Sequence, residues 1–253
     1  MRALEGMSVL ITGGGSGIGE GAAKHFASKG ARVTVAGRRE EPLAQTVSSI
    51  GESAAYVAGD VTVARDRARM VQAAVENGEG LDVLISNAGN IYRCDVEDYE
   101  EDQLLDLFHS NVVGGMMLLK ESIPYLKESK GAVLFVGSVH TQRAFPNASP
   151  YAATKGAVET LTGVLAAELG KHGIRVGCVR PGAVLTEINV RAGLSSPEEA
   201  KERLEGMGNM HALGRIGTPE EIAEAFEYLA CAEWTTGNVL TVDGGLSLGV
   251  TQE

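Results

Sequence analysis

The sequence predicts an α/β fold: a doubly wound parallel sheet of about seven strands with helices on both faces, in a single domain that spans residues 1–253. Short apolar segments alternate with longer segments of helical periodicity, which is typical of strands joined by crossover helices. A glycine-rich turn lies between the first strand and the first helix. No linker, repeat or low-complexity stretch divides the 253 residues, a length that single α/β domains often reach.

Seven segments have the composition of buried strands. They are residues 7–12, 31–36, 54–58, 81–86, 131–137, 174–180 and 239–242. Helical patterns lie between them, among them 17–28, 103–125 and 150–171. Right-handed crossovers and a reversal of strand order place a ligand crevice at the carboxyl ends of such strands. We therefore expect the residues that end these strands to form a site.

The region 185–213 has no strand character. It contains Gly193, Pro197, Gly206 and Gly208 between short amphipathic pieces. We interpret it as a mobile lid over a substrate site, with a static connector as the alternative.

Composition excludes some classes of function. The formal net charge of −11 argues against binding to nucleic acid or to an anionic membrane. No apolar run approaches the ~20 residues of a membrane span, so a cytoplasmic location is expected. Cys94, Cys178 and Cys231 have no pairing or metal-ligand spacing, and no metal site is predicted.

The glycine-rich turn predicts a phosphate site. It directly follows the segment 7–12 and opens the helix 17–28, so backbone N–H groups and a helix N-terminus converge there. Glycine permits positive φ and the close approach of a pyrophosphate. The expected cofactor-binding residues of this turn are Gly13, Gly15, Ser16, Gly17, Ile18 and Gly19.

The end of the second predicted strand indicates which dinucleotide is bound. An acidic residue there would accept hydrogen bonds from a ribose 2′-hydroxyl, but the sequence has Gly37, Arg38 and Arg39. Guanidinium groups suit a 2′-phosphate, so NADP(H) is preferred and NAD(H) remains possible. The alternative is that the arginines, with Glu40 and Glu41, form a solvated helix start.

Tyr151 and Lys155 are four residues apart in a predicted helix and share one face. A free tyrosine has a pKa of about 10, too high for proton transfer near neutrality. An ammonium about 4 Å away attracts a phenolate by roughly 4 kcal/mol at an effective dielectric of about 20, which would lower the pKa of the phenol. Such a pair also occurs by chance on surface helices, so its context decides.

That context resembles the short-chain dehydrogenase/reductase family, which has a Rossmann fold, over nearly the whole chain. The similar motifs are Thr12-Gly13-x-x-x-Gly17-x-Gly19, Asp60-Val61, Asn87-Ala88-Gly89, Asn111, Ser138 with Tyr151 and Lys155, and the loop from Pro181 to Thr186. Ser86 stands where many members have a second asparagine. Ser16 stands where some NADP-using members have a basic residue, so Arg38 and Arg39 are the main support for NADP(H).

The resemblance implies roles for these residues. Asp60 and Val61 would contact the adenine, and the nicotinamide side would be held by Asn87, Ala88, Gly89, Pro181, Gly182, Val184 and Thr186. Tyr151 and Lys155 would also contact the cofactor, with Lys155 on the nicotinamide ribose. The implied catalytic residues are Asn111, Ser138, Tyr151 and Lys155, with Asn111 anchoring a relay water. The alternatives are a helix-bending or capping role for Asn111 and a plain turn for Ser138.

The substrate is less well defined by the sequence. Ser138, His140, Arg143 and Tyr151 are the candidate substrate residues, with His140 as a pocket wall. Arg143, together with Tyr92 and Arg93, would suit a carboxylate, a phosphate or a polyhydroxylated compound. Equally, these arginines would point to solvent or to another subunit.

The favoured function is an NADP(H)-dependent carbonyl reductase that transfers a hydride between the nicotinamide and a small-molecule carbonyl or secondary alcohol. The alternatives are an NAD-dependent alcohol or sugar dehydrogenase and, less favoured, a non-catalytic nucleotide-binding sensor. The resemblance also implies a homodimer or homotetramer that pairs the helices 103–125 and 150–171.

Overall fold

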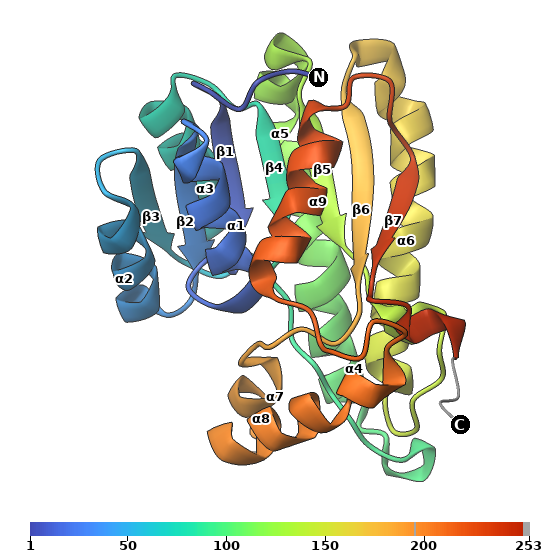
Figure 1. The fold of residues 1–253 in the computed structure, drawn as a ribbon. Coiled ribbons are helices and arrows are strands. Elements are labelled where there is room, and N and C mark those ends of the chain that lie inside the picture. Colours follow the sequence, from blue (N-terminus) through green and yellow to red (C-terminus); the bar gives the residue numbers. More distant parts are fainter. Residues whose placement is uncertain (195, 250–253) are drawn as a thin grey trace.

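The computed structural model of the protein describes residues 1–194 and 196–249. A seven-stranded sheet in the order β3-β2-β1-β4-β5-β6-β7 forms its centre, and neighbouring strands run parallel (Figure 1). The strands are β1 (Ser8–Thr12), β2 (Arg32–Gly37), β3 (Ala54–Ala58), β4 (Val83–Ser86), β5 (Ala132–Val136), β6 (Arg175–Pro181) and β7 (Asn238–Val242). The predicted fold class is confirmed, and each strand lies within two residues of its predicted bounds.

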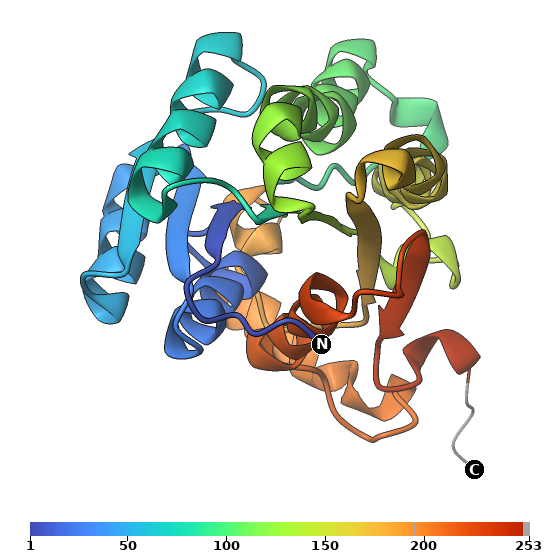
Figure 2. The same ribbon diagram turned by 90° about the horizontal axis from the view of Figure 1, so that it is seen from above.

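Helices cover both faces of this sheet (Figure 2). Their bounds are α1 (Gly17–Ser28), α2 (Glu40–Ile50), α3 (Ala64–Gly78), α4 (Glu101–Phe108), α5 (Gly114–Ser129), α6 (Ser149–Leu169), α7 (Ile188–Arg191), α8 (Pro197–Gly206) and α9 (Pro219–Cys231). Helices α1, α2 and α9 share one buried cluster with the sheet, and α3, α5 and α6 share another. The three-layer arrangement follows from these two clusters.

Alternating strand residues supply the two cores. Val9 and Ile11 of β1 pack in the cluster that contains Phe26 of α1, whereas Leu10 packs in the cluster that contains Met70 of α3. All five side chains are fully buried. Because successive side chains of a strand point to opposite faces, a strand covered on both sides is apolar throughout. This explains why the central strands β1, β4 and β5 are nearly continuous apolar runs in the sequence.

The strand order reverses at β1, which lies between β2 and β4. At the carboxyl ends of β1 and β4, the hydroxyl oxygen of Thr12 accepts hydrogen bonds from the backbone N–H groups of Asn87 (3.0 Å) and Ala88 (2.9 Å). After β1 and after β4 the chain continues on opposite faces of the sheet, so a crevice opens between the two connections. The same edge faces α7 and α8 (Figure 1).

One helix differs from the prediction. The continuous helix expected over 103–125 is instead α4, a π-helical turn at His109–Val113, and α5, which ends at Ser129. A π-turn contains one residue more than an α-turn, and such bulges are frequent at functional sites. Asn111 lies in this turn and is buried. The periodicity of the sequence correctly predicted helix over this range but did not reveal the extra residue of the π-turn.

The region predicted as a lid forms two helices, α7 and α8, and a 3₁₀ turn at Gly208–Met210. Ser196 caps α8: its hydroxyl oxygen accepts from the Glu199 backbone N–H, and the Glu199 carboxylate accepts from the Ser196 backbone N–H. This reciprocal capping fixes where α8 begins. The lid remains a prediction, since its motion is a separate property from its secondary structure.

Within residues 1–194 and 196–249, the helices are all too short or too polar to cross a membrane. The same residues contain no group of three His, Cys, Asp or Glu side chains arranged to hold a metal ion. Cys94, Cys178 and Cys231 are free thiols.

Gly19 provides a test of the glycine turn. A Cβ at this position would lie 2.3 Å from the carbonyl oxygen of Gly13 and 2.6 Å from the Asn87 amide nitrogen. Because the turn must shift to admit it, Gly19→Ala is expected to lower the free energy of unfolding by about 1–3 kcal/mol in urea denaturation. Gly170→Ala is the control, since Gly170 has a φ of −55° and open space around it. Equal urea midpoints for the two variants would contradict the packing described here.

Candidate active site

Two adjoining pockets form a groove along the carboxyl edge of the sheet. The outer pocket lies at the ends of β2 and β3 and is lined by Arg38, Arg39 and Asp60, among others. The inner pocket lies at the ends of β4, β5 and β6 and is lined by Ser138 and Tyr151, among others. Both are lined by residues of the glycine turn and of the segment after β4, so they are continuous with each other.

Most residues predicted from the sequence line this groove. The outer pocket contains Gly13, Gly15, Ser16, Arg38, Arg39, Asp60, Val61, Ala88 and Gly89. The inner pocket contains Gly13, Ser16, Gly17, Ile18, Asn87, Ala88, Gly89, Ser138, His140, Tyr151, Lys155, Pro181, Gly182, Val184 and Thr186. Three predicted residues do not line either pocket: Gly19, Asn111 and Arg143.

The glycine turn fits the phosphates of a dinucleotide. Gly13 has a φ of +68° and a Cβ there would lie 2.8 Å from the Asn87 amide nitrogen, while that amide donates to the carbonyl oxygens of Thr12 (2.8 Å) and Gly13 (3.3 Å). Gly17 has a φ of +56° and faces Thr186. Ser16 stands at the N-cap of α1 without capping it through its side chain. The first N–H groups of α1 are therefore available to an anion.

Arg38 and Arg39 are held loosely in the outer pocket. Arg38 donates to the Asn90 side-chain oxygen at 3.4 Å. Arg39 donates to the Ser16 hydroxyl and to Glu187, both at 3.3 Å, and the Arg39 and Glu187 side chains are 47% and 58% exposed. Exposed pairs of this kind contribute little to stability. Most guanidinium donors of both residues are therefore available to a ligand.

Tyr151 and Lys155 lie one turn apart at the start of α6, as their spacing predicted. The Lys155 Nζ atom is 5.5 Å from the centroid of the Tyr151 ring. It donates to the carbonyl oxygen of Val136 at 2.8 Å, at the end of β5, and the Lys155 residue is only 6% exposed. An ammonium has three donors. One of them anchors α6 to β5, which fixes the charge beside the phenol.

Ser138 begins the 3₁₀ turn Val139–Thr141 that follows β5. Its hydroxyl oxygen accepts the backbone N–H of His140 at 3.3 Å and lies 3.0 Å from His140 Nδ1. The His140 ring packs edge-on against Tyr151, with a centroid separation of 5.2 Å. His140 therefore contacts both Ser138 and Tyr151 and lines the inner pocket, where the sequence placed it as a pocket-wall residue.

The protonation of His140 follows from its neighbours. Burial, and then the charges of Arg93, Arg203 and Lys155, lower the pKa of His140 to about 4, so the ring is neutral at physiological pH. Its Nε2 atom lies 3.3 Å from Arg93 Nη2. Arginine can only donate, so Nε2 must accept and the single ring proton is assigned to Nδ1. Nδ1 then donates to Ser138, whose own hydroxyl proton is left for a third partner.

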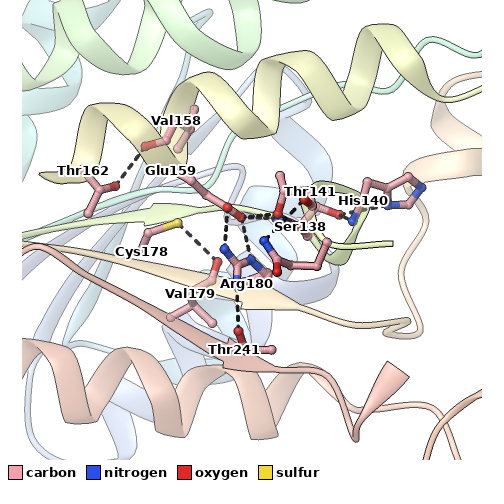
Figure 3. A network of polar contacts seen from close by, with 11 residues as sticks. Ser138, His140, Thr141, Val158, Glu159, Thr162, Cys178, Val179, Arg180 and Thr241 are labelled. Atoms are coloured by element: carbon pink, nitrogen blue, oxygen red, sulfur yellow. Dashed lines mark hydrogen bonds and ion pairs between the residues drawn. The ribbon is translucent and has the colours of Figure 1, made fainter. Parts of the chain in front are cut away.

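A largely shielded ion pair between α6 and β6 supports this turn (Figure 3). Glu159 of α6 pairs with Arg180 of β6 at 2.7 Å, and their side chains are 10% and 14% exposed. Glu159 also accepts from the Thr141 hydroxyl (3.0 Å) and from the Ser138 backbone N–H (3.4 Å). The sequence reasoning missed both residues of this pair. Glu159 is four residues beyond Lys155, so helical spacing could have placed it on the face of α6 that carries the Tyr-Lys pair.

Asn111 connects two parts of the site without entering the groove. Its side-chain oxygen accepts from the Asn90 backbone N–H (2.7 Å) and the Ser110 hydroxyl (3.2 Å). Its amide nitrogen donates to the Asn90 carbonyl (2.9 Å) and the Thr154 hydroxyl (3.1 Å). The side chain therefore has a partner for each of its four hydrogen-bonding positions. It ties the segment after β4 to α6.

Arg143, predicted as a substrate residue, is directed elsewhere: its Nη1 atom donates to the Leu246 carbonyl at 2.9 Å. The turn after Ser138 places Arg143 beside the C-terminal segment and not in the pocket. The spacing of residues in the sequence does not specify this direction. Tyr92 also lies outside the inner pocket, which is lined instead by Arg93 and Arg203. Arg203 was not singled out in the sequence because it is one polar residue of an exposed, amphipathic helix, α8.

Comparison with known proteins agrees with this geometry. The chain matches a family model described as enoyl-(acyl carrier protein) reductase over residues 13–247. Together with the similarities below, this match shows that the protein belongs to the short-chain dehydrogenase/reductase family of oxidoreductases, which bind nicotinamide cofactors.

Relatives of several activities share the fold over nearly the full length. A glucose 1-dehydrogenase of Gluconobacter oxydans is 36% identical, covering 96% of this chain and 92% of the relative. An L-fucose dehydrogenase of Bos taurus is 34% identical, covering 96% and 90%. The crystal structure of a 3-ketoacyl-(acyl-carrier-protein) reductase from Brucella melitensis, complexed with NADH, matches with a TM-score of 0.87 at 34% identity, covering 96% and 99%.

The pKa of His140 leads to a pH prediction. An unfolded chain protonates histidine near pH 6.5, whereas His140 in the folded protein does so only near pH 4. Between these values the unfolded state binds more protons, so folding stability falls as the pH falls from 6.5 to 4, by at most about 3 kcal/mol. His140→Gln is expected to lose less free energy of unfolding over this range than the unmodified protein. Urea denaturation at several pH values, and ¹⁵N NMR of the imidazole, measure the two effects. An imidazole that titrates between pH 6 and 7 would contradict the assignment.

Proposed function

We propose that the protein is an NADP(H)-dependent oxidoreductase that transfers a hydride between the nicotinamide and a carbonyl or secondary alcohol substrate, with Tyr151 as general acid and base. The observation that carries the proposal is the grouping of Ser138, Tyr151 and Lys155 at the end of β5, with the Lys155 ammonium 5.5 Å from the phenol ring. This grouping adjoins a glycine turn suited to phosphates.

The bound cofactor supplies the hydride. The residues that would hold its nicotinamide end are Asn87, Ala88, Gly89, Pro181, Gly182, Val184 and Thr186, and those that would hold its phosphates and adenosine are Gly13, Gly15, Ser16, Gly17, Ile18, Arg38, Arg39, Asp60 and Val61. Gly19 would contribute indirectly: because it has no Cβ, the glycine turn can pack closely against Gly13.

Ser138 and Tyr151 act on the substrate oxygen. Ser138 accepts two hydrogen bonds from His140, so its hydroxyl proton is free to be donated to the carbonyl oxygen. Tyr151 gives the proton that the reduced oxygen requires, and takes it back in the oxidising direction. Lys155 places its positive charge beside the phenol ring and would offer its remaining donors to the nicotinamide ribose. In this scheme His140 positions Ser138 and takes up no proton.

Asn111 would take part in returning the proton to solvent. Its side-chain atoms all have protein partners, so a relay water would have to bind its backbone carbonyl, in the π-helical turn. The helix-bending role considered from the sequence is compatible with this, since the residue lies within the bulge itself.

The preference for NADP(H) is supported by the two arginines of the outer pocket and by Gly37, which leaves room beside them. The alternative is an NAD-dependent alcohol or sugar dehydrogenase. It is supported by the Brucella melitensis relative, whose structure was solved with NADH, and by the glucose and L-fucose dehydrogenases among the relatives. A non-catalytic sensor is less well supported, because Ser138, Tyr151 and Lys155 are all present.

A homodimer or homotetramer is proposed from the family resemblance. Apolar side chains are exposed on α4, α5 and α6, where the helices expected to pair lie; among them are Leu105 (60%), Phe108 (37%), Met116 (42%) and Val164 (52%). The cytoplasmic location and the substrate lid over 185–213 stay predictions from the sequence.

Tyr151→Phe tests the general acid. The variant keeps the ring beside Lys155 but has no proton to transfer, so kcat is expected to fall by about 10²–10⁴. NADPH binding, followed by nucleotide fluorescence, is expected to remain. Tyr228→Phe, at an exposed position of α9, is the control and is expected to keep full activity. Turnover by Tyr151→Phe at the unmodified rate would exclude Tyr151 as the acid.

Arg38→Asp tests the choice of cofactor. Loss of a charge-assisted hydrogen bond to the 2′-phosphate is expected to weaken NADPH binding by about ten- to a hundredfold. NADH binding should be kept or improved, since a carboxylate can accept from the 2′-hydroxyl. Arg32→Asp makes the same charge change at the opposite end of β2 and serves as the control. Tighter binding of NADH than of NADPH by the unmodified protein would favour the NAD-dependent alternative.

A further inference from the structure

The inner pocket contains more positive charge than the proposed chemistry uses. Lys155 is accounted for by its position beside Tyr151, but Arg93 and Arg203 also line the pocket and have no role in proton or hydride transfer. Arg93 follows β4, and Arg203 belongs to α8. They therefore reach the pocket from the sheet edge and from the region over it.

Arg93 is held in the pocket with unused donors. Its Nη2 donates to His140 at 3.3 Å, while its Nε is buried and has no hydrogen-bond partner among the described residues. Burial lowers the pKa of Arg93, and the charge of the nearby Arg203 lowers it further. A buried donor without an acceptor is costly. Because Arg93 lines the inner pocket, the guanidinium donors that His140 does not use can meet an acceptor on a bound ligand.

Arg203 is an exposed residue of α8, yet it lines the pocket. Its side chain has no hydrogen bond or ion pair with any other residue in the described parts of the chain. By contrast, Lys201 on the same helix lies 3.8 Å from Glu205. The positive charge of Arg203 is therefore directed to the pocket without a protein counter-charge.

Acidic side chains do not offset these charges. Among the described residues that line the inner pocket, Glu187 is the single carboxylate, against the three cations Arg93, Lys155 and Arg203. The groups that depress the pKa of His140 are Arg93, Arg203 and Lys155, all cations. The pocket is thus locally positive in a protein whose formal net charge is −11.

We propose that the substrate carries an anionic oxygen group, such as a carboxylate, which binds between Arg93 and Arg203 within a few bonds of the reacting carbonyl. The inference rests on the proposed function, because it takes Ser138 and Tyr151 as the position of that carbonyl. One imidazole separates Arg93 from Ser138, with contacts of 3.3 Å and 3.0 Å on its two sides. This short interval selects a small oxo acid over a long acyl chain.

The test compares acids with neutral esters of the same skeleton. The probes are 2-oxobutanoate, 3-oxobutanoate and 4-oxopentanoate, each with its methyl ester, assayed with saturating NADPH or NADH. At least one acid is expected to have a kcat/KM about ten- to a hundredfold above that of its ester, the range of a charge-assisted hydrogen bond. Calorimetric binding of the acids to the NADP⁺-saturated protein gives a readout that does not need turnover.

Arg203→Gln is the sharper variant because, among the described residues, the Arg203 side chain has no hydrogen bond or ion pair that the substitution would break. It is expected to lower kcat/KM for the acid more than for the ester, so that the preference for the acid is lost. Arg93→Gln should lose the same preference and, through His140, should also lower kcat on the ester. Lys201→Gln removes a charge from the same helix outside the pocket, so kcat/KM should stay unchanged for both the acid and its ester.

The outcomes separate this inference from the proposed function. Esters that match or exceed their acids in all three pairs, or an acid preference that survives in both arginine variants, would overturn the anion site while leaving the reductase intact. Absence of turnover with every carbonyl and alcohol would count against the proposed function. In that case, acid binding that is lost in Arg203→Gln would still support the anion site.

Discussion

The attachment of α6 to the ends of β5 and β6 determines the geometry of the active site. Lys155 donates to Val136 at the end of β5, and Glu159, one turn later, pairs with Arg180 of β6. The two contacts fix both the depth and the rotation of the helix, and thereby the position of the Tyr151 ring relative to Ser138. The two side chains are 10% and 14% exposed, so removing one partner would leave the other charge poorly solvated and would destabilise the protein.

The same arrangement explains the electrostatics of the inner pocket. The His140 ring stays neutral because burial disfavours its charged form and because the charges of Arg93, Arg203 and Lys155 would repel a fourth positive charge. A neutral ring with one fixed tautomer is suited to orienting Ser138, whereas a ring that titrated near pH 6.5 would exchange this hydrogen bond with small changes of pH. The pocket is locally positive, whereas the protein as a whole is negative. An anion is therefore attracted to the pocket only when it is close to it.

The sequence predicted what depends on local patterns. The strands follow from apolar runs, the phosphate turn from glycines between a strand and a helix, and the Tyr151–Lys155 contact from helical spacing. What it missed depends on tertiary packing. The π-turn at Asn111 has no separate periodicity over five residues, the direction of Arg143 is decided by the path of a turn, and Arg203 reaches the pocket only because α8 folds over the strand ends. Glu159 was partly predictable: its position on the helix face of Lys155 follows from the sequence spacing, but its pairing with Arg180 of β6 does not.

Arg93 gives the proposed anion site a physical connection to the chemistry. A guanidinium has five donors, so Arg93 can bond His140 and a substrate carboxylate at once. A bound anion would hold this guanidinium in place, and the guanidinium in turn holds the His140 tautomer that leaves the Ser138 proton free. A neutral ester would reach the same carbonyl position without this constraint. The charge of the substrate would therefore affect two properties: its binding, and the availability of the Ser138 hydroxyl proton. Arg203 would contribute only to binding, whereas Arg93 would contribute to both.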